Sequence, residues 1–189
     1  VTTCERAAAL IRKLLSFSGK KPAGASLISV NDRISGMRHL LEKSLTAAIQ
    51  LEVSLDRDLG MVLADPDDLE NMLLNLALNS RDAMPKGGRL SIETAKQFVD
   101  DGYVRLHPGS RSGEFVVISI TDNGIGMSAD VMERVFEPFF TTKGAGKGTG
   151  LGLSMAYGFI QRAAGFVIID SEPGMGTTFS IFLPRVDLK

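Results

Sequence analysis

The chain has few of the residues that build disulfides and histidine-rich metal sites. Its 189 residues include one cysteine, Cys4, and two histidines, His39 and His107. A lone cysteine excludes an internal disulfide and a cysteine-rich metal site, and two histidines argue against a histidine-rich zinc site. No apolar run approaches the roughly 20 residues of a membrane-spanning helix, and the opening residues do not resemble a signal peptide. We therefore expect a soluble domain of a reducing compartment.

The sequence also lacks an excess of either charge. Lys and Arg number 21 against 22 Asp and Glu, which gives a formal net charge of −1 at pH 7. This balance offers no electrostatic reason to expect nucleic acid or an anionic membrane as a partner. The length suits one domain with a real core and a short appendage. We expect it in the cytoplasm, whether its parent protein is membrane-anchored or soluble.

Two amphipathic helices are expected in the first quarter of the chain. In the first, apolar residues recur at helical spacing from Ala7 to Leu15, and the helix ends near Gly19. The second is expected from about Asn31 to Leu45, after a short linker. We therefore divide the chain into a helical stub at 1–21, a linker at 22–30 and a main domain at 31–189.

The main domain alternates between strand and helix patterns. Strands are expected at 49–56, 61–64 (as the short partner of the strand before it), 90–95, 115–121, 166–171 and 177–183, with a polar loop at 109–113. Further helices are expected at 65–84, 129–135 and 151–163. Apolar and polar residues alternate within the strands, as in a sheet that helices cover on one face. The predicted fold class is α/β, a two-layer sandwich with a mixed sheet and helices packed mainly on one face.

The helix expected after Asp65, a favourable N-cap residue, carries a narrow polar stripe. At 100° per residue, Asn71, Asn75, Asn79 and Asp82 fall within about 80° of one another, and apolar residues fill the opposite side and the flanks. Amide and carboxylate oxygens suit a hard cation such as Mg²⁺. The alternative is a solvent-facing stripe on an ordinary amphipathic helix, which the apolar flanks disfavour.

Two later turns combine a polar residue with glycines. Asp122 ends a strand and is followed by Asn-Gly-Ile-Gly, which contains Gly124 and Gly126. A tight turn is the ordinary explanation. A carboxylate at a strand end can also accept a hydrogen bond from an adenine amino group, and the glycines would let the backbone approach the base. The second turn contains Thr177 and by itself would be a hairpin turn.

The segment between Val135 and Leu151 is rich in glycine and contains two lysines. A flexible linker is the default interpretation of such a composition. However, phenylalanines precede it and it leads into an apolar helix, and a glycine-rich backbone at a helix N-terminus can cradle phosphates. We expect a lid that becomes ordered over a nucleotide, although no P-loop motif is present. The expected phosphate-binding residues are Gly148, Thr149, Gly150, Leu151 and Gly152, with Lys143 or Lys147 on the terminal phosphate.

These segments occur in the order of a known family. They resemble the N, G1, F, G2 and G3 boxes of bacterial sensor histidine kinases, here Asn71–Asn79, Asp122–Gly126, Phe136–Phe139, Gly148–Gly152 and Gly174–Phe179. The resemblance covers about Leu51 to Pro184, and its order and spacing make it specific. These kinases share their ATP-binding fold with gyrase, heat-shock chaperone and mismatch-repair ATPases. The resemblance implies that the chain binds Mg-ATP and passes the γ-phosphoryl group to a histidine in two-component signal transduction.

The resemblance also implies roles for single residues. Asn79 would hold the magnesium ion that bridges the phosphates, and Asn75 would line the pocket one turn earlier. Asp122 would select adenine, with support from Thr177. Related ATPases carry a water-activating glutamate at the position of Asn75, and an asparagine cannot accept a proton. Only Asp82 shares the stripe as a weak hydrolytic base, so we expect Asn75, Asn79 and Lys143 to serve phosphoryl transfer rather than hydrolysis.

The partners follow from the same resemblance. Kinases of this family phosphorylate a histidine on a helical hairpin that precedes the ATP domain, and neither His39 nor His107 fits that motif. The stub at 1–21 resembles the tail of the second helix of that hairpin. We therefore expect the chain to be part of a larger, homodimeric kinase. Its partners would be its own histidine hairpin and the receiver domain of a response regulator, with no nucleic acid and no membrane contact.

Three other functions fit part of the pattern. An ATPase switch of the gyrase and chaperone type would share the fold, although Asn75 argues against it. A non-catalytic nucleotide sensor, including one that reads a cyclic dinucleotide, would share the pocket. A serine kinase that acts on a protein partner is the third.

Overall fold

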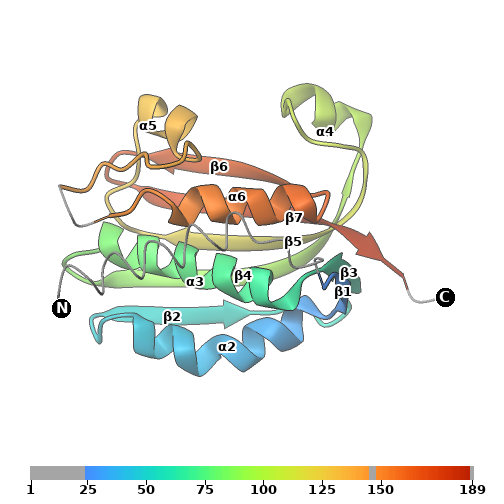
Figure 1. Cartoon of the computed structure of the whole chain (residues 1–189), viewed down its shortest axis with the longest axis horizontal. Helices are drawn as coiled ribbons and strands as arrows, with labels where there is room; N and C mark the ends of the chain where they lie inside the picture. The colour runs from blue at the N-terminus through green and yellow to red at the C-terminus, as the bar shows by residue number, and fades with distance from the viewer. Residues whose placement is uncertain (1–23, 145–147, 188–189) are drawn as a thin grey trace.

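The computed structural model describes residues 24–144 and 148–187, which form two layers (Figure 1). Seven strands make one mixed sheet: β1 (Ser26–Ile28), β2 (Ile49–Ser54), β3 (Met61–Ala64), β4 (Gly88–Val99), β5 (Gly113–Asp122), β6 (Phe166–Glu172) and β7 (Gly176–Val186). The helices are α2 (Val30–Ser44), α3 (Pro66–Ala83), α4 (Asp101–Leu106), α5 (Ala129–Arg134) and α6 (Gly152–Arg162). Helices α2, α3 and α6 cover one face of the sheet. The predicted two-layer α/β architecture is confirmed.

The strand order is β1-β3-β7-β5-β4-β2, and β6 pairs with β7. All pairs are antiparallel except β2 with β4. The prediction that the strand at 61–64 pairs with the strand at 49–56 is wrong, because β3 lies between β1 and β7, near the opposite edge from β2. At the end of β2 the Asp56 amide donates to Thr94 Oγ1 at 3.0 Å, and the chain then crosses to the far edge. Alternation of side chains predicts a strand but carries no information on its partner.

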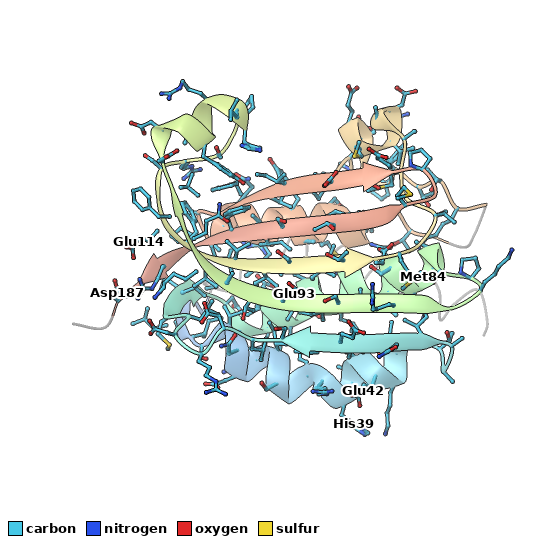
Figure 2. All side chains as sticks on the ribbon, turned by 180° about the vertical axis from the view of Figure 1, so that it is seen from behind. His39, Glu42, Met84, Glu93, Glu114 and Asp187 are labelled. Carbon is cyan, nitrogen blue, oxygen red and sulfur yellow. The ribbon has the colours of Figure 1, made fainter. Side chains whose placement is uncertain are left out.

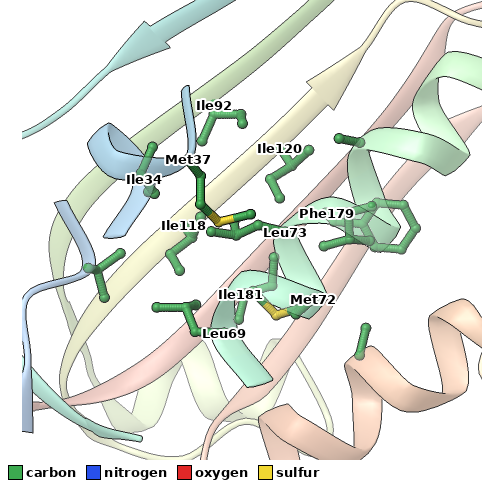
Figure 3. Packing of buried hydrophobic residues seen from close by; sticks show 14 of the residues in the cluster. Ile34, Met37, Leu69, Met72, Leu73, Ile92, Ile118, Ile120, Phe179 and Ile181 are labelled. Atoms are coloured by element: carbon green, nitrogen blue, oxygen red, sulfur yellow. The ribbon is translucent and has the colours of Figure 1, made fainter. Parts of the chain in front are cut away.

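Helix α3 forms as its sequence predicts. Asp65 caps it by accepting from the amides of Asp67 and Asp68 at 3.0 and 3.3 Å, and Pro66 occupies the first turn. The apolar side of α3 packs against the middle of the sheet, where Leu73 lies among Ile118 and Ile181 (Figure 3). This contact makes α3 the centre of the main core.

The other face of the sheet has a smaller core. The side chains of Val99, Phe115, Val117, Phe166 and Phe182 form it, and Tyr103 and Val104 of α4 pack on it. The rings of Phe166 and Phe182 stack with centroids 4.4 Å apart. Helix α4 was not predicted, because its six residues bury none of their side chains fully and so leave no helical apolar pattern.

Two boundaries differ from the sequence-based division. Part of the expected linker at 22–30 lies in the sheet, since Ser26–Ile28 pair with β3 and the side chains of Ile28 and Val30 are buried in the main core. The isolated apolar residues of so short a strand do not show in a periodicity. The helical stub expected at 1–21 lies outside the described residues. Across the part of the chain that the structure describes, no helix has both the length and the apolar character needed to cross a membrane.

The central position of α3 leads to a stability prediction. Leu73→Ala should lower the free energy of unfolding by about 2–5 kcal/mol, because Leu73 is fully buried and its removal leaves a cavity. Leu40→Ala is the matched control, since Leu40 is 49% exposed on α2, and it should change stability by less than about 0.5 kcal/mol. Urea unfolding measures both. Equal losses would contradict the placement of the core.

Candidate functional site

A cavity of about 480 Å³ lies between α3, the start of α6 and the loops that follow β5 and α5. Most residues predicted to bind a nucleotide line it: Asn75, Asn79, Asp82, Asp122, Gly126, Lys143, Gly148, Thr149, Gly150, Gly152 and Thr177. Gly124 and Leu151 do not line it, and Lys147 lies outside the described residues. Segments far apart in the sequence therefore meet around one cavity.

The floor of the cavity is the polar stripe of α3. Asn75, Asn79 and Asp82 line the cavity, so this part of the stripe faces a cleft, whereas Asn71 at its start is exposed and does not line the cavity. Glu70 lies away from it and forms a 3.5 Å ion pair with Arg33. Among the acidic residues of α3, Asp82 is therefore the one that lines the cavity.

In the buried part of the cavity lining, Asp122 is 4% exposed. Its Oδ2 accepts a hydrogen bond from Ser80 Oγ at 2.8 Å, and its Oδ1 accepts from the amide of Gly124 at 2.9 Å. Thr177 is the direct cross-strand partner of Asp122 between β5 and β7. The Thr177 hydroxyl lies 2.9 Å from that of Ser171, which also accepts from the amide of Met127 at 2.9 Å. The buried carboxylate of Asp122 thus accepts two hydrogen bonds and lies beside a second hydrogen-bonded group of hydroxyls.

Two glycines permit this arrangement. A Cβ on Gly126, at φ 64°, would stand 1.9 Å from the carbonyl oxygen of Glu172. A Cβ on Gly176, at φ 97°, would stand 2.0 Å from the carbonyl oxygen of Asp122. Gly126, which was expected to let the backbone approach a base, therefore lets two segments of the protein approach each other, and Gly176 does the same. Gly124 has a similar role, because its amide binds Asp122 and its Cα lies against the end of α3.

In a more exposed part of the cavity lining, the ammonium group of Lys143 contacts α3. Its Nζ lies 2.7 Å from Asp82 Oδ2 and 3.3 Å from Asn79 Oδ1. Asp82 Oδ1 accepts from Arg81 Nη2 at 2.9 Å. Partial burial of Asp82 opposes ionisation, but the hydrogen bonds and charges of Lys143 and Arg81 outweigh it and lower the pKa of this carboxyl. Asp82 is therefore ionised and doubly paired.

The glycine-rich segment leads into the N-terminus of α6 beside Asn75. Gly148, Thr149, Gly150 and Gly152 line the cavity, and a Cβ on Gly152 would lie 3.6 Å from Asn75 Oδ1. The residue before α6, Leu151, provides no side-chain cap. The first amides of this 11-residue helix are thus left to a ligand or to water, as in an anion-binding helix end.

The cavity also has apolar walls that the motifs did not indicate. Ile125, Met127, Val131, Val135, Leu153 and Phe179 line it together with Phe140, over which Arg134 stacks at 4.5 Å. Ser80 was also missed, because on a helical wheel it falls on the apolar side of α3, opposite the asparagines. A serine among buried leucines was the one signal that could have revealed it, since a buried hydroxyl needs a partner.

Neither histidine lies at this site. His39 is exposed on α2 (Figure 2), and His107 stacks on Tyr103 with ring centroids 4.1 Å apart. Among residues 24–144 and 148–187, no cluster of three or more His, Cys, Asp or Glu side chains could hold a metal ion. A cation bound in the part of the cavity around Lys143 would therefore depend on Asn79, Asp82 and oxygens of a bound ligand.

Fold and site together correspond to a known class of ATPases. The chain belongs to the family of histidine kinase-, DNA gyrase B- and HSP90-like ATPases, whose model matches residues 64–187. Among its curated relatives, the sensor kinase CckA of Brucella abortus is 44% identical over 96% of this chain and 19% of its own length. The sensor histidine kinase ZraS of Salmonella typhimurium is 34% identical over 88% of this chain and 33% of its own length. This is the ATP-binding catalytic domain that sensor histidine kinases carry in two-component signalling, and the predicted family is confirmed.

Solved structures support the same fold. The mycobacterial sensor histidine kinase MprB aligns with a TM-score of 0.68 at 22% identity, covering 87% of this chain and 99% of that one. Full-length ShkA, solved in complex with AMPPNP, aligns with a TM-score of 0.75 at 23% identity over 95% of this chain and 36% of ShkA. The chain spans only about a fifth to a third of the curated relatives described above.

The contact between Ser80 and Asp122 leads to a second prediction. Ser80→Ala should destabilise the domain by about 1–3 kcal/mol in urea unfolding, because it removes a donor from a buried carboxylate. Ser44→Ala is the control, since that hydroxyl also donates from a helix, to the Leu40 carbonyl at 2.7 Å, but is exposed. Its loss should cost less than about 0.5 kcal/mol. A Ser80→Ala protein as stable as the Ser44→Ala protein would show that the buried hydrogen bond contributes nothing.

Proposed function

We propose that this chain binds Mg-ATP in the cavity and donates the γ-phosphoryl group to a histidine on a helical hairpin of its parent protein. The observation that carries this proposal is the polarity of the cavity. Its lining holds a buried carboxylate, that of Asp122, and a more exposed ammonium group beside an amide oxygen, those of Lys143 and Asn79. A nucleotide has complementary chemistry, with an amino group on its base and negative charge on its phosphates. ShkA, a relative in fold, was solved with the ATP analogue AMPPNP.

Each residue has a defined part in this proposal. Asp122 accepts from the adenine amino group, with its carboxylate held by Ser80 and Gly124 and with Thr177 beside it. The apolar walls enclose the base. The uncapped first turn of α6 and the glycines before it bind the phosphates, and Lys143 pairs with the terminal phosphate. Asn79 would hold Mg²⁺, an oxygen-seeking ion that neutralises phosphate charge when bound.

The same residues disfavour hydrolysis. Asn75 lies beside Gly152 at the phosphate end, and its amide cannot take a proton from water. Asp82 is the one carboxylate on the stripe, but two cations pair with it and its lowered pKa makes it a weak base. Phosphoryl transfer needs little proton chemistry from the protein, since positioning and charge neutralisation supply most of the catalysis.

The partners we propose follow from membership of the family. They are the hairpin histidine, a second copy of the parent protein in a homodimer, and the receiver domain of a response regulator.

Base selectivity tests the role of Asp122. Asp122→Asn should weaken ATP binding by about 1–3 kcal/mol, because one carboxylate oxygen is replaced by an amide donor. The parent protein should bind GTP poorly, since guanine presents a carbonyl where adenine presents an amino group. Calorimetry with each nucleotide measures both effects, and Asp170→Asn, on the exposed part of β6, controls for charge. Equal ATP and GTP affinity in the parent would remove the base-recognition role.

Phosphotransfer tests the function itself. With γ-labelled ATP and Mg²⁺, the chain should show almost no self-labelling and little free phosphate, and should pass acid-labile label to a separately supplied hairpin of the parent protein. In this step the bond between the β,γ-bridging oxygen and the γ-phosphorus breaks, a P–N bond forms, ADP leaves and the imidazole loses a proton to solvent. Transfer will be slow, because separating hairpin and domain sacrifices effective concentration.

Two controls make this assay decisive. Asn79→Ala, or EDTA, should abolish transfer, whereas Asn31→Ala should not, because Asn31 hydrogen-bonds Asp56 and Thr94 away from the cavity. Brisk release of free phosphate with no label on the hairpin would instead assign the chain to the ATPase branch of the family. Binding of nucleotide with neither reaction would favour a non-catalytic sensor.

A further inference from the structure

We propose that Asn79 and Asp82 are the two protein ligands of a divalent-cation site, and that the ammonium group of Lys143 fills this site until the metal replaces it. The proposal rests on the proposed binding of Mg-ATP and deepens it. It makes Asp82 a ligand of the cation and not a base that activates water. It also gives Lys143 two positions in succession, first on Asn79 and Asp82 and then on the terminal phosphate. Metal binding and release of the lysine then become one exchange.

The geometry of the three residues supports this exchange. Asn79 and Asp82 are three residues apart on α3, which puts both side chains on one face of the helix. Lys143 reaches them from the segment between α5 and α6, and its Nζ is 2.7 Å from the Asp82 oxygen and 3.3 Å from the Asn79 oxygen. One positive group thus lies between an amide oxygen and a carboxylate oxygen, the ligand types that Mg²⁺ takes from proteins.

Charge makes the two occupants mutually exclusive. Asp82 already pairs with Arg81 through its other oxygen, so one carboxylate is shared by two cations. A divalent ion placed beside them would add two further positive charges within a few ångströms, where repulsion is strong. Lys143 must leave for the metal to bind. Its flexible four-carbon stem allows that movement, and Arg81 stays in place through its hydrogen bond to the Ser44 carbonyl at 3.1 Å.

The exchange has a functional consequence. A metal that arrives with the nucleotide displaces the ammonium group of Lys143 from α3 and frees it for the terminal phosphate. The lysine therefore competes with the metal when no nucleotide is present and assists the same metal when nucleotide is bound.

Binding of Mn²⁺ alone, followed by electron paramagnetic resonance without nucleotide, tests the proposal on the whole chain. Lys143→Gln should tighten Mn²⁺ binding roughly tenfold over the parent, the effect of losing one charged contact. Lys86→Gln is the matched control, because it removes one positive charge just beyond the same helix from an exposed side chain that does not line the cavity. It should change the affinity less than twofold. Adding Asp82→Asn to Lys143→Gln should return the affinity to the parent value or below.

Two results would overturn the proposal. One is a Lys143→Gln protein whose Mn²⁺ affinity changes no more than that of Lys86→Gln. The other is tight Mn²⁺ binding that survives loss of the Asp82 carboxylate. Thermal unfolding of each variant verifies folding, and both Lys143 and Asp82 are partly exposed, so their replacement leaves the core intact. Calorimetry with ATP on the parent chain is independent of these titrations: its failure would remove the proposed function, whereas normal ATP binding with either result above would remove only the cation exchange.

Discussion

The buried carboxylate of Asp122 is the constraint on which the site depends. Asp122 is only 4% exposed, so its oxygens need donors from the protein. Ser80 provides one from α3, and the amide of Gly124 provides the other from the loop after β5. These contacts tie the end of the main core helix to the sheet, and Gly176 lets the β6–β7 turn close over the same strand end. The part of the cavity around Asp122 is therefore built from contacts that also hold the two layers together.

The part of the cavity around Lys143 is organised differently from the part around Asp122. Lys143, Asn79, Asp82 and Arg81 meet there through partly exposed ion pairs, which contribute little to stability. A region with weak contacts can rearrange when a ligand arrives, whereas the buried network around Asp122 cannot. The family contains both kinases and ATPases, and the proposal that this chain hydrolyses little ATP rests on the side chains of this region. Here Asn75 is not a carboxylate and Asp82 is paired.

The sequence predicted those elements whose formation depends on neighbouring residues, such as helix caps and apolar periodicity. The cap at Asp65, the apolar side of α3 and the alternation in β5 and β7 were sufficient to place those elements, and the stripe on α3 indicated the floor of the cavity. Features that depend on distant segments were missed. The partner of β3, the strand β1 inside the expected linker, and the bond from Ser80 to Asp122 arise only when the chain is folded. Helix α4 packs on a second, smaller core, so its six residues carry no periodic signal.

The register of β5 against β7 sets a limit on how the domain can be altered. Asp122 is opposite Thr177, and a slip of one residue would turn every side chain of β7 to the wrong face and separate the two. The turn between β6 and β7 also leaves no room for insertion, because its Gly176 lies against the carbonyl oxygen of Asp122. The connection through α4 joins the other ends of β4 and β5, far from the cavity (Figure 1). A fluorophore or an inserted reporter domain placed in the α4 connection would leave the strand pairing undisturbed, and this connection is where the domain can be labelled.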